Sequence, residues 1–360
     1  MKKRNWIIIG LVLLLGVAAL VVYLVMSPNH TNDNDFHIEA AAQPGAVSRI
    51  FMADKENHQM LLTYQSDSLW LVDNKYPANQ PKIDMLLETL AEMRVRNNVN
   101  RAAVENVTSM IAAKSVKVEV YYDDYRINLF KGKIRFWRHE KCRVFYVGHD
   151  TLDMMSTYMY AEGDELPRVI YIPGFRGCLS PRFVVDPLAW RSHSIVDLPV
   201  QRIAKVELTI PSMPSESFAV VREGEGFVFN LLNPPMRVNG FDTARVAQLL
   251  SSFVNLNFDE FARAVPKVVL DTTFSQQPRT ILRVTDVDGN VNEVKTYIKY
   301  TNPDDIYNMP DTTMYDVFDI NRLYAVVDSK DTVLIQYYIF DNILQPASFF
   351  LGREKSVFAR

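Results

Sequence analysis

Apolar positions recur at helical spacing in two separate parts of the chain. The first stripe runs from Ile83 to Met93 and the second from Val246 to Leu256, and each predicts an amphipathic helix with one buried face. Corresponding positions lie 163 residues apart (246 minus 83). Asn79 and Asp242, separated by the same offset, are good N-caps. The two stripes consist of Ile83, Leu86, Leu87, Leu90 and Met93, and of Val246, Leu249, Leu250, Phe253 and Leu256.

Alternating apolar and polar positions, typical of half-buried strands, repeat in the same way. Val118 and Leu282 begin similar strand patterns 164 residues apart (282 minus 118), and Val47 and Ile203 begin another pair 156 residues apart (203 minus 47). Such near-constant offsets indicate an internal duplication. The extra residues of the second copy are expected in a loop at 231–239, which contains two prolines.

These patterns predict an α+β fold in which two duplicated lobes each form an antiparallel sheet with helices on one face. Hairpin turns are expected at Lys131-Gly132 and at Asp288-Gly289. The expected organisation is a cytoplasmic tip with a membrane anchor, a stalk, a first lobe, a linker and a second lobe. These parts are placed at residues 1–26, 27–35, 36–185, 186–200 and 201–360.

The N-terminal segment is the most hydrophobic part of the sequence. Residues 7–26 carry no charge and would form a helix of about 30 Å, long enough to cross a bilayer. Basic residues at positions 2–4 predict a cytoplasmic N-terminus, a single inner-membrane span and a periplasmic remainder. The small residues Val17 and Ala19 leave a cleaved signal peptide as an alternative, and a buried core helix is a third.

Composition and charge narrow the function classes. The 360 residues are 48% hydrophobic and 22% charged, an ordinary globular composition that excludes a disordered chain or a collagen. With 39 Lys and Arg against 42 Asp and Glu, the net charge is −3. A broad basic surface for nucleic-acid phosphates is therefore not expected, and no nucleic-acid partner is predicted.

The sequence contains no G-x-S-x-G, H-E-x-x-H, Walker A or G-x-G-x-x-G motif, and no catalytic, cofactor-binding or metal-binding residue is predicted. Adjacent acids at Asp123-Asp124, Asp259-Glu260 and Asp304-Asp305 could serve a glycosidase, but solvated turns explain them better. Cys142 and Cys178 are candidates for a disulfide in an exported protein; small core residues are the alternative. With His139 and His149 they also offer zinc-ligand types, although without the paired spacing of zinc sites.

Asp followed by Ser or Thr and then an apolar residue or Thr occurs six times, where composition predicts roughly one. The pattern resembles the O-glycosylation site of exported proteins in the Bacteroidota. Helix caps and turns are the structural alternative for each. The candidate acceptors are Ser68, Thr151, Thr243, Thr272, Thr312 and Thr332.

Several short motifs follow one another in a recognisable order from residue 46 to residue 191. They are AVSRIFMADKENHQMLL from Ala46, LWLVDNKYPAN from Leu69, IDMLLETL from Ile83, VFYVG from Val144, IPGF from Ile172 and LAWR from Leu188. With the basic start and the apolar segment, they resemble the membrane-anchored envelope proteins of Bacteroidota classed under a domain of unknown function, family number 4340. That resemblance implies an association with ABC transporter components of the gliding-motility type and supplies no catalytic residues.

Within these motifs, Pro173, Gly174, Phe175, Trp190 and Arg191 are candidate structural or contact positions. Pro173-Gly174 suits a tight turn, and Trp190 is expected to pack between the lobes. The preferred interpretation is a non-enzymatic, membrane-anchored interaction module, an accessory subunit of an envelope transport complex. The alternative is an envelope enzyme for glycan or peptide with acidic residues between the lobes, and a third is a structural spacer.

Overall fold

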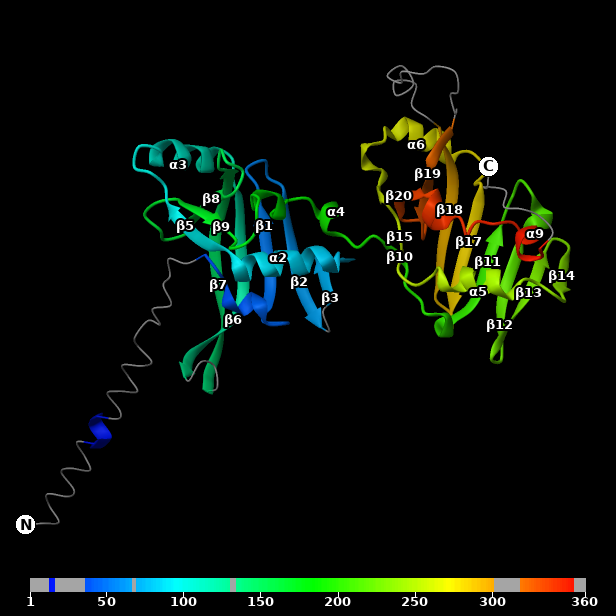
Figure 1. The fold of residues 1–360 in the computed structure, drawn as a ribbon, viewed down its shortest axis with the longest axis horizontal. Coiled ribbons are helices and arrows are strands. Elements are labelled where there is room, and N and C mark those ends of the chain that lie inside the picture. The colour runs from blue at the N-terminus through cyan, green and yellow to red at the C-terminus, as the bar shows by residue number, and fades with distance from the viewer. Residues whose placement is uncertain (1–12, 17–35, 67–68, 130–133, 301–317, 353–360) are drawn as a thin grey trace, which may run out of the picture. The chain divides into compact units, whose positions relative to one another are not determined.

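The computed structural model describes residues 13–16, 36–66, 69–129, 134–300 and 318–352 of the chain. The chain divides into two compact units, unit 1 to Ser192 and unit 2 from His193. The division falls inside the range that the sequence analysis assigned to a linker. Each unit is built around one nine-stranded sheet in which every pair of neighbouring strands is antiparallel (Figure 1).

In unit 1 the strands are ordered β4-β3-β2-β1-β6-β7-β8-β9-β5 across the sheet. The strands are β1 (Val47–Ala53), β2 (Gln59–Ser66), β3 (Leu69–Val72), β4 (Tyr76–Pro77), β5 (Arg94–Asn98), β6 (Val116–Leu129), β7 (Ile134–Asp150), β8 (Thr157–Ala161) and β9 (Arg168–Tyr171). The helical elements are η1 (Glu39–Ala42), α2 (Gln80–Glu92), α3 (Val104–Ala113), η2 (Ser180–Arg182) and α4 (Pro187–Trp190).

The large sheet of unit 2 has the order β14-β13-β12-β11-β17-β18-β19-β20-β16, and β10 pairs with β15 separately. The strands are β10 (Ser194–Val196), β11 (Ile203–Thr209), β12 (Phe218–Glu223), β13 (Gly226–Leu232), β14 (Pro235–Val238), β15 (Leu256–Asn257), β16 (Glu260–Phe261), β17 (Thr280–Asp286), β18 (Val291–Tyr300), β19 (Phe318–Val327) and β20 (Asp331–Gln336). The helical elements are η3 (Val200–Arg202), η4 (Pro214–Glu216), α5 (Thr243–Ser251), η5 (Ala262–Ala264), α6 (Lys267–Phe274), α8 (Tyr337–Phe340) and α9 (Ala347–Phe350).

The two large sheets share their register as well as their strand order. Ile50 pairs with Val120 between β1 and β6, and Val206 pairs with Val284 between β11 and β17. Ile50 and Val206 are 156 residues apart, and Val120 and Val284 are 164 residues apart. These are the offsets found in the hydrophobic pattern. The register of both strand pairs also shifts at a corresponding place. The shift follows Val47 in β1 and Ile203 in β11. The equal registers support the predicted duplication, which stays a prediction.

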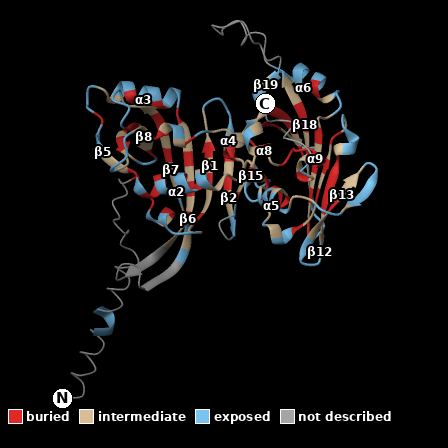
Figure 2. Ribbon diagram, turned by 45° about the vertical axis from the view of Figure 1, so that its right-hand side comes forward, coloured by how far each residue is buried: buried red, intermediate tan, exposed pale blue. Residues whose placement is uncertain are grey.

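Helices α2 and α5 begin where the sequence pattern places them. The side chain of Asn79 accepts a hydrogen bond from the backbone N–H of Lys82, and Asp242 accepts from the N–H groups of Ala244 and Arg245. The predicted N-caps are therefore confirmed. Buried residues concentrate along the strands and on the inner faces of the helices, as Figure 2 shows.

The predicted α+β class, with helices on one face of each sheet, is wrong. The fold is mostly antiparallel sheet with few and short helices, and those helices lie on both faces. In unit 1 the α2 face buries Phe145 of β7, while the α3 face packs against Tyr146, the next residue along that strand. In unit 2, α6 contacts the face that contains Tyr324, opposite Leu323. Because successive side chains of a strand point to opposite faces, both sheets are covered on two sides.

The predicted loop at 231–239 is also wrong, because Pro235–Val238 form the edge strand β14. Proline is tolerated there because one side of an edge strand needs no backbone hydrogen bond. The predicted hairpins have the expected paired strands: β6 with β7, whose turn lies outside the described residues, and β17 with β18.

Within the described part of the chain, no helix is long and apolar enough to cross a bilayer. A span requires about 20 helical residues, and the longest helix described, α2, has 13. The predicted N-terminal transmembrane helix is thus contradicted, together with the membrane as a partner and the inner-membrane location derived from it. Of residues 7–26, only 13–16 are described, as a helical turn; the predicted stalk at 27–35 lies outside the described residues.

Candidate functional site

A concave pocket of about 360 Å³ lies in unit 1, at the lower end of the size range of small-ligand sites. Helix α2 lines it on one side, and η1 with the following segment 43–45 lines it on another. The backbone N–H of Ile38 donates to the carbonyl of Leu90 at 2.7 Å and holds the segment before β1 against α2. No Lys, Arg or His is among the described residues that line the pocket.

Two aromatic side chains from neighbouring strands contribute to the lining. The rings of Tyr64 on β2 and Trp70 on β3 have centroids 5.7 Å apart. A Cβ atom at Gly45 would meet the Tyr64 ring at 3.1 Å, and the φ of Gly45 is +71°, so both space and backbone require glycine there. Trp70 is only 3% exposed, and its indole N–H donates to none of the described residues. It is therefore a donor without a partner among the described residues, and its nitrogen is not one of the fully buried atoms that lack a partner.

Three acidic side chains of α2 also line the pocket. Asp84, Glu88 and Glu92 recur every four residues, so they share one helix face at intervals of about 6 Å. The Gln80 amide donates to Asp84 at 2.7 Å, but no described cation forms an ion pair with any of the three. Like charges four residues apart destabilise a helix, and Glu92 at the C-terminal end also opposes the helix dipole. Helix stability therefore does not account for these acids.

Unit 2 lacks this acidic face. The residues 163 positions later are Ala247, Ser251 and Asn255, all uncharged. The helix α5 nevertheless buries Val246, Leu249 and Leu250 of the matching apolar stripe. The architecture thus forms without the acids, which distinguishes the α2 face of unit 1 as a specialised surface.

The acids of α2 are too far apart to bind one metal ion. Among the described residues, the one group of potential ligands within 4.8 Å of each other is Asp54, Glu56 and His58, in the exposed turn after β1. Asp54 already accepts hydrogen bonds from the backbone N–H groups of Glu56 and His58 and contacts the His58 ring at 2.8 Å. Desolvation opposes ionisation of Asp54, yet these hydrogen bonds lower its pKa. The cluster shapes the turn.

The candidate contact positions 173–175 form a tight turn after β9. Phe175 N–H donates to the carbonyl of Ile172, and Gly174 has a φ of +82°. Pro173 followed by a glycine with positive φ fits a type II turn. The ring of Phe175 is partly exposed and contacts the guanidinium of Arg182 at 4.4 Å. These residues lie outside the pocket lining.

Trp190 and Arg191 have different surroundings. Trp190 belongs to the core of unit 1, and its indole N–H donates to the carbonyl of Val184 at 2.8 Å. The Arg191 guanidinium stacks on the ring of Tyr76, 3.8 Å from its centroid. Neither residue lines the pocket.

The structure does not contain the predicted disulfide. Cys142 on β7 is an exposed free thiol, and Cys178, in the loop after β9, is a half-buried one. Burial raises the pKa of both thiols, and Asp150 raises that of Cys178 further. The structure therefore gives neither cysteine the lowered pKa of a nucleophile.

The candidate glycosylation positions are spread over both units, and their modification stays a prediction. Thr243 and Thr272 are exposed, whereas Thr151 and Thr332 are half-buried. Thr272 lies within α6 and its hydroxyl donates to the carbonyl of Val268, while Thr243 follows the N-cap of α5. Ser68 and Thr312 lie outside the described residues.

Both described pairs of adjacent acids are bound to basic side chains. Every one of these four acids therefore has a basic partner, which does not favour a catalytic acid and base. Arg138 and Lys141 pair with Asp123 and Asp124, Arg322 pairs with Asp259 and Glu260, and Asp304-Asp305 lies outside the described residues.

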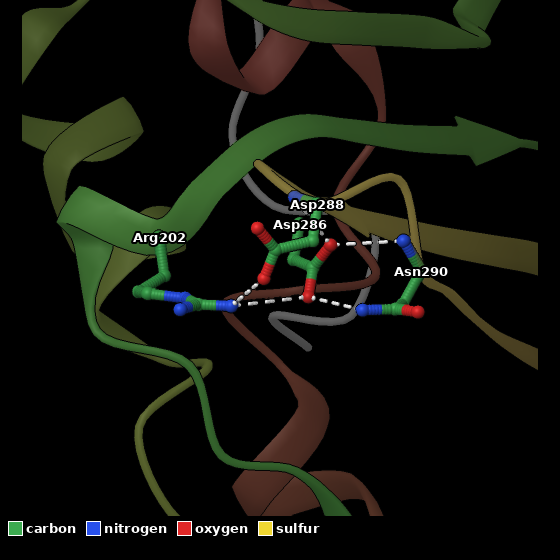
Figure 3. A network of polar contacts seen from close by, with 4 residues as sticks. All are labelled: Arg202, Asp286, Asp288 and Asn290. Atoms are coloured by element: carbon green, nitrogen blue, oxygen red, sulfur yellow. Dashed lines mark hydrogen bonds and ion pairs between the residues drawn. The ribbon is translucent and has the colours of Figure 1, made fainter.

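The turn between β17 and β18 forms a compact polar network in unit 2 (Figure 3). One carboxylate oxygen of Asp286 accepts from the backbone N–H groups of Asp288 and Asn290, and the other accepts from the Asn290 amide at 2.8 Å. The guanidinium of Arg202 contacts Asp286 and Asp288 from the opposite side. Arg202 therefore supplies the positive charge that faces the two carboxylates. The hydrogen bonds hold the turn, in which Gly289 has a φ of +87°.

This network predicts a pH-dependent stability for unit 2. Hydrogen bonds, foremost that from Asn290, lower the pKa of Asp286. A carboxyl with a lowered pKa stabilises the fold above its unfolded pKa, about 4, and this contribution is lost as the pH falls through the folded value. Asp286→Asn should therefore lower the melting temperature at about pH 7 and do so much less at about pH 3, measured by calorimetry. An equal decrease at both pH values, or a larger effect of the exposed control Asp288→Asn, would contradict this role.

A comparison with protein families matches residues 70–272 to the family described as Domain of unknown function (DUF4340). The match covers more than half of the 360 residues. The chain belongs to this family. Searches among curated proteins and among solved structures gave no significant match.

The DUF4340 match extends across both units, from β3 to α6. It includes Trp70 and the acidic face of α2 and begins after Tyr64. The family assignment confirms the coarse part of the resemblance and leaves the activity unknown. The Bacteroidota origin and the transporter relation are not shown.

Sequence reasoning missed the pocket. The spacing of Asp84, Glu88 and Glu92 was the available signal, because three acids on one helix face without basic partners are unfavourable for the helix. The aromatic side of the pocket had no local signal. Tyr64 and Trp70 approach the helix through the order of strands β2 and β3, which no short pattern encodes.

Proposed function

We propose that this protein is a non-enzymatic interaction module whose binding site is the pocket of unit 1. The observation that carries the proposal is the row of three acids on α2 that form no described ion pair and line a pocket with two aromatic residues, with uncharged residues 163 positions later in unit 2. Acidic residues that destabilise the helix they belong to are expected where their charge serves recognition of a partner. The role as an accessory subunit of a transport complex stays a prediction within this proposal.

The proposal is tested by comparing partners of the wild-type protein and of Glu88→Arg after mild cross-linking in native cells. The introduced arginine pairs with Asp84 and Glu92 on the same helix face, which closes the acidic site and supports the helix. We expect proteins recovered with the tagged wild type to be lost from Glu88→Arg. Mass spectrometry of the recovered material measures this loss.

The matched control is Glu165→Arg, which makes the same charge change at an exposed residue of unit 1 outside the pocket. It should retain the wild-type set of partners. Equal recovery with Glu88→Arg and with wild type would overturn the pocket as the binding site. Recovery of transporter subunits in fixed proportion with the wild type and the control alone would support the accessory role.

A further inference from the structure

We infer that the partner of the unit 1 pocket is an extended basic peptide segment with Lys or Arg at alternate positions. This inference rests on the proposed function and adds the chemical class of the partner. It is carried by three observations: the spacing of the acids, the donor of Trp70 that has no described acceptor, and the pocket that all of them line.

The spacing of the acids matches an extended chain. Asp84, Glu88 and Glu92 follow one another at about 6 Å along α2, since each residue of a helix rises 1.5 Å. Alternate side chains of an extended peptide lie on one side at intervals of about 6.6 Å. Basic side chains at every second residue therefore face the three carboxylates in turn. A single small cation would leave two of the acids unpaired.

The aromatic side supplies the two interactions that such a peptide requires besides charge. The partly exposed ring of Tyr64 offers surface to the aliphatic stem and cationic end of one basic side chain that enters the pocket. The indole N–H of Trp70, a residue of the pocket lining, has no acceptor among the described residues and is a donor for a peptide carbonyl. A donor at this position does not suit a bare cation, which has no oxygen to accept.

Metal binding is a poorer explanation of the same acids. The carboxylates of α2 are not among the described groups whose ligand atoms lie within 4.8 Å of one another. A divalent ion needs its oxygen ligands at about 2.0–2.6 Å from one centre, which side chains about 6 Å apart along a helix do not provide. The arrangement distributes negative charge along a surface, as recognition of a polybasic segment requires.

The experiment measures binding of synthetic peptides to the full-length protein by fluorescence polarisation. The probe is an acetylated, amidated peptide that alternates lysine with serine, compared with a peptide of the same composition whose lysines are contiguous. We expect the alternating peptide to bind about 3–10-fold more tightly, and lysine acetylation to abolish binding. Raising the salt concentration should weaken binding, because exposed charge pairs are screened.

Three variants separate recognition from folding. Glu88→Gln should weaken binding of the alternating peptide about 3–5-fold while raising the melting temperature by about 1–3 °C, because two like-charge pairs of α2 are removed. Trp70→Phe removes the N–H donor and should weaken binding about 3–10-fold; because it also shrinks a core side chain, its melting temperature is measured alongside. Glu165→Gln, away from the pocket, should bind as the wild type does.

Equal binding of the two peptides, or unchanged binding by Glu88→Gln at a retained fold, would overturn the inference. So would tighter binding of free choline than of the alternating peptide, which would assign the pocket to a small organic cation. If partners in cells are lost from Glu88→Arg although no basic peptide binds, the proposed function stands and the partner class is wrong. If Glu88→Arg retains the cellular partners, the proposed function itself fails.

Discussion

Trp190→Ala is expected to lower the free energy of unfolding of unit 1 by about 3–5 kcal/mol, the range for truncating a large buried aromatic side chain. Trp190 is 3% exposed and lies in the same core as the apolar stripe of α2. For a unit of this size, such a loss corresponds to a decrease of roughly 6–20 °C in melting temperature. Urea unfolding and calorimetry of the full-length protein measure both quantities.

The environment of Trp190 explains why one side chain has so large an effect. Its indole N–H donates to Val184, and its backbone carbonyl accepts from the N–H of Asn79, the N-cap of α2. The Nζ of Lys82 donates to the neighbouring carbonyl of Ala189 at 2.6 Å. Helix α4 is thus fastened to the first turn of α2, and loss of the tryptophan leaves both a cavity and an unsatisfied carbonyl at Val184.

Phe175→Ala is the matched control, because it removes another aromatic side chain of the same unit. Phe175 is 38% exposed and contacts Arg182 at the surface, so its truncation should cost about 1 kcal/mol or less. Similar losses for Trp190→Ala and Phe175→Ala would show that Trp190 is not a core residue. A nearly unchanged melting temperature with loss of partner binding would instead assign Trp190 to a contact surface.

The sequence predicts the sheets and the principal helices well because their signals are local. Alternation along Val118 and Val120 marks a strand with one buried face, and Asn79 and Asp242 mark helix starts by their side-chain chemistry. The structure has a strand and two capped helices at these places. The sequence distances between such apolar positions also indicate the strand register. This is because the register of paired strands is set by which residues face the core.

The coverage of the sheets is not a local property, and it was predicted wrongly. Strand β8 has Met159 on one face and Tyr158 and Tyr160 on the other, and both sets are packed. A tyrosine, whose aromatic ring ends in a hydroxyl, fits an exposed face of a sheet as well as a covered one. The alternation of residues along the strand therefore indicates only that one face is buried. The second helix of each unit, α3 or α6, covers the face that the pattern leaves undecided.

The range predicted as a linker illustrates a second limit. Residues 186–200 contain α4, which belongs to unit 1, and β10, which pairs with β15 in unit 2. Proline residues and a short apolar run gave no indication of either contact. Pairing between Val196 and Leu256 joins residues that are far apart in the sequence, and only the folded chain brings them together.

The corresponding substitutions Leu86→Ala in α2 and Leu249→Ala in α5 are expected to cost about 2–5 kcal/mol each. Both leucines are fully buried, at matching positions of the two hydrophobic stripes and in separate cores. Because the chain forms two compact units, we expect calorimetry to show two transitions, with each substitution lowering one of them. The double variant should show the sum of both losses within about 0.5 kcal/mol, as distant sites do.

Met85→Ala and Gln248→Ala are the controls, because each lies on an exposed face of the same helix, one residue before the buried leucine. Each should change stability by about 1 kcal/mol or less. A single transition lowered equally by Leu86→Ala and by Leu249→Ala would show that the units unfold as one block. Two independent transitions with equal costs would mean that each repeat of the hydrophobic stripe stabilises its own core, so that the acids on the outer face of α2 are free to serve binding.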